Sequence, residues 1–65
     1  MKKYEVHFWF GLHSPNPFIT PSKVVEVEVD EGTDKDGVIL SGLQQIGTYP
    51  RTYSASVFPV VKKGG

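Results

Sequence analysis

Hydrophobic and polar residues alternate along three segments of the chain, and this period of two predicts three β-strands. The segments are residues 4–10, 23–30 and 52–61. One face of the predicted sheet is apolar and consists mainly of Tyr4, Val6, Phe8, Phe10, Val25, Val27, Val29, Ala55 and Val57. The other face is mixed and contains Glu5, His7, Trp9, Val24, Glu26, Glu28, Ser54, Ser56 and Phe58. We therefore expect a sheet with one buried face.

Between the second and third strands the apolar period changes to that of a helix, predicted over residues 34–46. Ile39, Leu43 and Ile46 form one apolar stripe, with Leu40 beside it. Thr33 is the expected N-cap, and Gly47 suits the left-handed position that ends a helix.

Two glycines, Gly37 and Gly42, fall inside this predicted helix. Each costs about 1 kcal/mol relative to alanine in a helix interior. Either they weaken the helix, or they allow it to lie close against the sheet.

The element order is thus strand, strand, helix, strand. The simplest arrangement is an α+β fold: a three-stranded antiparallel sheet in order 2-1-3, with one helix packed on one face. The aromatic first strand is then central. Pro59 lacks a backbone N–H, so its strand belongs at an edge. Residues 1–65 are expected to form one domain, with a flexible tail over residues 62–65.

The face of the sheet without the helix is the candidate interaction surface. The predicted contact residues are Glu5, His7, Trp9, Glu26, Glu28 and Phe58. Tryptophan is enriched at interface hot spots, and the carboxylates would favour a partner with a basic patch. The alternative is that Trp9 and Phe58 only cover each other across neighbouring strands.

The connection over residues 11–22 contains three prolines and is unusually long for a hairpin. Its apolar side chains are Leu12, Phe18 and Ile19. Such a loop can carry function. Alternatively, Phe18 and Ile19 fold back and cap the core.

Composition narrows the function classes. The chain has 65 residues and no cysteine, which excludes disulfides and thiolate metal sites. Seven basic residues balance seven acidic ones, so the basic excess of a typical nucleic-acid binder is missing, and near-neutrality is compatible with a homodimer. No apolar run is long enough for a membrane span or a signal peptide, and a cytoplasmic protein is expected.

No pattern points to catalysis, to a metal or cofactor, or to a small-molecule substrate. His7 and His13 lack the spacing of metal ligands, and a flat sheet offers no pocket to exclude water. Aromatic residues on a sheet can stack single-stranded bases. Here Glu5, Glu26 and Glu28 would repel the phosphates, which makes nucleic acid the weaker alternative.

Two resemblances bear on function. In its element order, in residues 29–33 and in its terminal Gly64-Gly65, the chain resembles ubiquitin-like sulfur carriers and modifiers. That resemblance implies that Gly65 would be the carboxylate that is adenylated. In strand order and length, the chain also resembles small phage-encoded proteins that inhibit a host enzyme by binding it. The sequence thus predicts a non-enzymatic protein-binding module, with the Gly-Gly carrier and the single-strand binder as alternatives.

Overall fold

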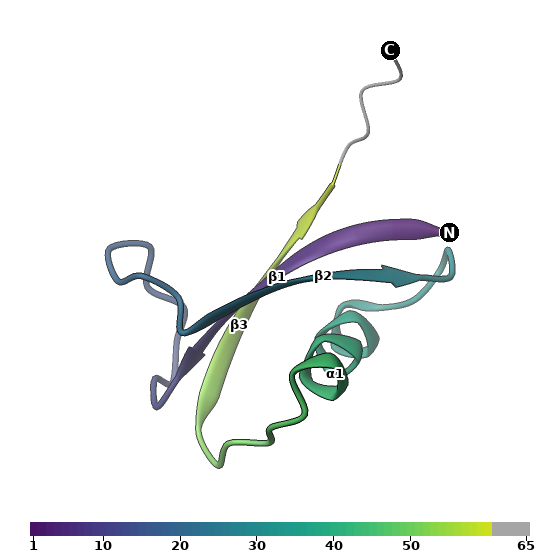
Figure 1. Ribbon diagram of the computed structural model, residues 1–65. Coiled ribbons are helices and arrows are strands. Elements are labelled where there is room, and N and C mark those ends of the chain that lie inside the picture. The colour runs from purple at the N-terminus through teal and green to yellow at the C-terminus, as the bar shows by residue number, and fades with distance from the viewer. Residues whose placement is uncertain (61–65) are drawn as a thin grey trace.

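The computed structural model describes residues 1–60 and contains three strands and one helix (Figure 1). The strands are β1 (Lys2–Phe10), β2 (Lys23–Val29) and β3 (Tyr53–Pro59), and the helix is α1 (Lys35–Ile46). Both strand pairs are antiparallel, and the order across the sheet is β2-β1-β3. The predicted fold class and strand order are therefore confirmed. The tail over residues 62–65 and the Gly64-Gly65 pair lie outside the described residues.

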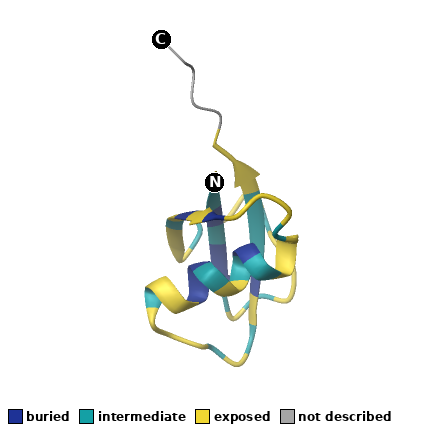
Figure 2. Cartoon of the chain, turned by 90° about the vertical axis from the view of Figure 1, so that its right-hand side faces the viewer, coloured by how far each residue is buried: buried dark blue, intermediate teal, exposed yellow. Residues whose placement is uncertain are grey.

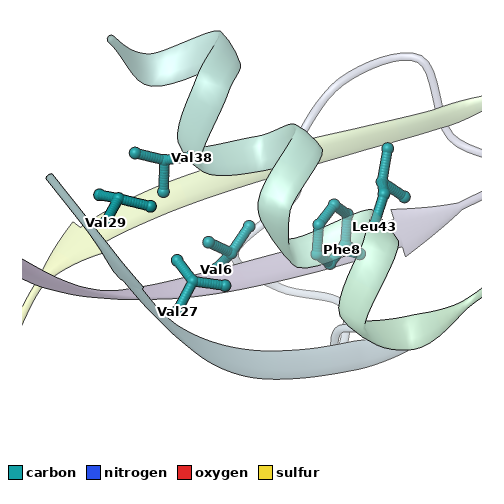
Figure 3. Packing of buried hydrophobic residues seen from close by; sticks show 6 residues of the cluster. All are labelled: Val6, Phe8, Val27, Val29, Val38 and Leu43. Carbon is teal, nitrogen blue, oxygen red and sulfur yellow. The ribbon is translucent and has the colours of Figure 1, made fainter. Parts of the chain in front are cut away.

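The core lies between α1 and the apolar face of the sheet (Figures 2 and 3). Six buried side chains form it: Val6, Phe8, Val27, Val29, Val38 and Leu43. The other apolar residues expected on this face, such as Tyr4, Val25 and Ala55, are partly buried and pack around that cluster. Alternation along the strands thus placed the core face correctly.

The N-cap of the helix, and its first residue, each lie one position later than predicted. Asp34, not Thr33, is the N-cap: its Oδ1 accepts a hydrogen bond from the backbone N–H of Gly37 at 2.8 Å. Thr33 instead closes the preceding turn, because its hydroxyl donates to the carbonyl of Asp30 at 2.7 Å. Gly47 ends the helix as expected, at φ 79°, and its N–H donates to the carbonyl of Leu43. The Thr33 prediction was wrong because both residues are good caps and the backbone selected the aspartate.

The apolar stripe of α1 is also shifted. Val38 and Leu43 are buried, whereas Leu40 is 51% exposed. Ile39 and Ile46 are partly buried against the cluster. The helix is therefore rotated so that Leu40 faces away from the core.

Gly42 lets the helix approach the sheet. A Cβ at this position would lie 3.0 Å from Cζ of Phe8 and 3.2 Å from Cγ2 of Val25. Of the two explanations for the glycines, close packing therefore applies to Gly42. Without a side chain at Gly42, the backbone of α1 can lie directly against Phe8 and Val25.

We expect Gly42→Ala to destabilise the domain in spite of the better helix propensity of alanine. Overpacking a core costs about 1–3 kcal/mol, and the gain in propensity is about 1 kcal/mol. Because the Phe8 ring is fully buried, it has little room to move. Urea unfolding should show a net loss of up to about 2 kcal/mol. A variant as stable as the wild type, or more stable, would contradict the close packing.

The hydrogen-bond pattern between β1 and β3 explains why a proline is tolerated at position 59. Gly11 N–H donates to Thr52 O at 2.8 Å, and Val60 N–H donates to Lys3 O at 3.0 Å. Hydrogen-bonded pairs alternate in an antiparallel ladder, so the odd-numbered residues of β1 bond to β3. Pro59 lies opposite Tyr4, at a position whose N–H points away from β1. It therefore breaks no bond within the sheet, and β3 is an edge strand as predicted.

Candidate functional site

The sheet face opposite α1, here called the open face, carries the predicted contact residues. The register places Glu5 between Glu26 and Phe58, and His7 between Val24 and Ser56. The six predicted residues thus share one face, as alternation requires. The structure also adds a residue that the prediction left out: Lys3 stands opposite Glu28, in the same alternation.

Trp9 lies on the predicted face but is buried, whereas a contact residue is expected to be exposed. Its side chain is only 5% exposed. The indole Nε1–H donates to the backbone carbonyl of Ile19 at 2.8 Å. The 11–22 connection therefore folds over this end of the open face, on the side of the sheet away from α1 (Figure 1). Trp9 lies beneath the loop and holds it in place.

The loop is fixed by three further hydrogen bonds. Asn16 makes a side-chain turn, because its Oδ1 accepts from Phe18 N–H at 2.9 Å and its carbonyl accepts from Ile19 N–H at 3.1 Å. At the end of the loop, Ser22 Oγ accepts from the backbone N–H of Phe10 at 3.2 Å. The loop thus has a defined conformation at its tip and at its return to β2.

This conformation presents Phe18 to the outside. The side chain is 95% exposed, and Ile19 beside it is also exposed. The suggestion that Phe18 and Ile19 cap the core is therefore wrong: both side chains are exposed, and the loop is joined to the open face through the carbonyl of Ile19. A phenylalanine presented in this way can insert into a pocket on another molecule.

Next to Trp9, His7 is held between a carboxylate and an aromatic ring. His7 Nε2 and Glu5 Oε1 are 2.6 Å apart, a contact in which the imidazole N–H donates to the carboxylate. On its other side, the His7 and Phe58 rings pack edge-on with centroids 4.9 Å apart. Phe58 thus packs against His7, and it stays 48% exposed. The alternative in which Trp9 and Phe58 directly cover each other does not describe this face, because His7 lies between their positions along β1 and β3.

The charge on the open face is mixed. Glu5, Glu26 and Glu28 lie on it as predicted, but Lys3 Nζ is 3.8 Å from Glu26 Oε1. Both side chains are about half exposed, so this ion pair adds little stability. It does offset part of the negative charge at that end of the face. The carboxylate nearest to His7, that of Glu5, is already engaged in a hydrogen bond.

The contacts of His7 within the described residues are with Glu5 and with aromatic rings. Across the strands His7 faces Ser56, yet within residues 1–60 no hydrogen bond joins them. In the same part of the chain no group of three histidine and acidic side chains is placed to hold a metal ion. No helix in the described chain is long and apolar enough to cross a membrane.

Comparisons with known proteins give no further guide: no protein family, curated protein or solved structure matches this chain. The hypothesis of a Gly-Gly carrier depends on Gly64-Gly65, which lie outside the described residues. It stays a prediction from the sequence, and so does binding of single-stranded nucleic acid.

The role of Trp9 as the anchor of the loop can be tested directly. Trp9→Phe keeps a large ring but removes the donor to Ile19 O, a bond worth about 1 kcal/mol. We expect chymotrypsin to cut after Phe18 roughly fivefold faster under native conditions, because the loop opens more often. Tyr49→Phe, on the turn after α1, is the matched control. Unchanged cleavage in Trp9→Phe would show that the indole does not hold the loop.

Proposed function

We propose that this protein is a non-enzymatic binding module that recognises another protein through its open face and the adjoining loop. The observation that carries the proposal is Phe18, which is 95% exposed at the tip of a loop fixed by Trp9 and Asn16. Because this ring stays in water, folding gains almost no hydrophobic free energy from it. Burial against a partner would provide that gain.

Pre-organisation supports the same proposal. A flexible loop loses conformational entropy when it binds, and a loop already held in one conformation loses less. The prolines at positions 15, 17 and 21 restrict the backbone further. The loop therefore suits a rigid apolar anchor.

The remaining contacts are proposed around this anchor. Phe58 supplies a second exposed ring on the open face. Glu26 and Glu28 on β2 supply a charged rim, which favours a partner with a basic patch. Trp9 contributes by positioning the loop, and His7 by supporting Phe58. The proposal retains the expectation that the protein acts in the cytoplasm, as an inhibitor or accessory protein of a larger host enzyme.

Site-specific photo-crosslinking tests this function. The photoreactive residue benzoylphenylalanine replaces Phe18, Phe58 or Tyr49 in separate samples, and each is irradiated in lysate of the source cells. Tyr49 is the control because it is aromatic and 63% exposed but lies on the turn after α1. We expect positions 18 and 58 to capture the same protein and position 49 not to capture it. Capture from position 49 alone would refute the proposed surface.

A further inference from the structure

The two edges of the sheet differ in their chemistry. Since the odd-numbered residues of β1 bond to β3, its even-numbered residues bond to β2. The backbone groups of β2 that point away from β1 therefore belong to Val24, Glu26 and Glu28. The two glutamates put like charges along that edge, which discourages a second strand from pairing there. Outward-pointing backbone groups on β3 belong to Tyr53, Ala55 and Val57. No residue of β3 carries a charge.

The β3 edge also has space beside it. Since α1 packs mainly over β2, a hollow of about 440 Å³ lies between the helix and β3. Its lining consists of Asp36, Ile39, Leu40, Tyr53, Ser54 and Ala55. An added strand would therefore find Ile39, Leu40 and the Tyr53 ring on its helix side, and outward backbone groups that have no partner within residues 1–60.

From these features we propose that the β3 edge pairs with β3 of a second copy, joining two sheets into one antiparallel six-stranded sheet. This inference does not depend on the proposed function: it uses neither Phe18 nor Phe58, and Glu26 and Glu28 enter only as the reason that the β2 edge does not pair. The free edge is bounded by Thr52 before the strand and by Pro59 at its end. Three outward residues lie between these limits, and their midpoint is Ala55.

One register uses all of these outward groups. Ala55 pairs with Ala55 of the second copy, and Tyr53 pairs with Val57 of the second copy, twice by symmetry. Each of these pairs exchanges both of its backbone hydrogen bonds. A two-residue slip in one direction would bring Pro59 opposite Tyr53 and lose a donor. A slip in the other direction would leave Val57 opposite Arg51, before the strand begins.

Side chains favour the same register. The Tyr53–Val57 pair is an aromatic–β-branched combination, which stabilises neighbouring strands. Ser54 would stand opposite Ser56 of the second copy. Ser54 is only 8% exposed, and its Oγ has no hydrogen-bond partner among the described residues. Rotation of the Ser54 side chain toward the edge would bring this buried oxygen within reach of the Ser56 hydroxyl of the second copy.

Sedimentation velocity tests the pairing. The protein concentration should span about 10 µM to about 1 mM, because one pair of short strands makes a small interface and small interfaces associate weakly. We expect the mean mass to rise from 7.2 kDa toward twice that value. Ala55→Pro removes an outward N–H, as Pro59 does naturally, and should keep the protein monomeric. Val24→Pro makes the same change on the opposite edge and should dimerise as the wild type does.

Two further measurements decide the interpretation if Ala55→Pro proves poorly folded by circular dichroism. Tyr53→Lys leaves the backbone intact but puts a charge at the edge, and it should also remain monomeric. In the wild type, amide exchange at Tyr53, Ala55 and Val57 should slow as concentration rises. A monomer at every concentration would overturn the proposal. A dimer whose protection appears at Val24, Glu26 and Glu28 instead, or one that tolerates Tyr53→Lys, would also overturn it.

Discussion

Phe8→Ala should strongly destabilise the domain and lower the urea concentration at which it unfolds. Phe8 is fully buried in the core, and its ring lies 3.0 Å from where a Cβ at Gly42 would stand. Truncating a buried phenylalanine costs about 3–5 kcal/mol. A domain of this size has a total stability of only about 3–10 kcal/mol. One substitution therefore removes a large part of the free energy of unfolding.

The measurement is urea unfolding followed by circular dichroism, with Leu40→Ala as the control. Leu40 is half exposed and borders the hollow between α1 and β3 outside the buried cluster, so its truncation should change stability by about 0.5 kcal/mol or less. If Phe8→Ala lost less than about 1 kcal/mol, the core would not be centred on Phe8. Equal losses for the two variants would mean that α1 is rotated relative to the sheet.

Phe18→Ala should have the opposite profile: no change in stability and a large loss of partner binding. The side chain touches little of its own domain, so unfolding should stay within about 0.5 kcal/mol of the wild type. Removing a hot-spot aromatic costs about 2 kcal/mol or more of binding free energy. This corresponds to an affinity roughly thirtyfold weaker for the protein captured by crosslinking.

The control for this prediction is Tyr49→Ala, which removes another exposed aromatic away from the open face. Titration calorimetry with the captured partner should give wild-type affinity for Tyr49→Ala. If Phe18→Ala bound as tightly as the wild type, the exposed ring would have no part in recognition. The open face would then have to act through Phe58 and the carboxylates alone.

Much of the fold could be predicted from the sequence, because strand alternation is a local property. The period of two assigned each strand residue to a face, and Pro59 identified the edge strand. Gly42 was the clearest sequence signal that the helix packs closely on the sheet. Its low helix propensity, taken alone, suggested an unstable helix instead. Alternation, however, says which side of the sheet a residue lies on and nothing about what covers that side.

The candidate site was predicted less well for the same reason. Trp9 was assigned to the correct face, but its burial depends on the path of the 11–22 loop, which has no periodicity to follow. The exposure of Phe18 depends on that path too. One signal was available: an indole N–H on a sheet needs an acceptor, and the long loop beginning two residues later could supply one. The choice of Asp34 over Thr33 as the cap had no comparable signal.

The central claim is that the loop tip and Phe58 form one recognition surface. Hydroxyl-radical footprinting of the protein with its crosslinked partner, read by mass spectrometry, tests this claim most directly. We expect oxidation of Phe18 and Phe58 to fall on binding, while oxidation of Tyr49 and Leu40 stays as it is in the free protein. Protection of Tyr49 and Leu40 with Phe18 still fully reactive would place the partner on the helix side and contradict the account.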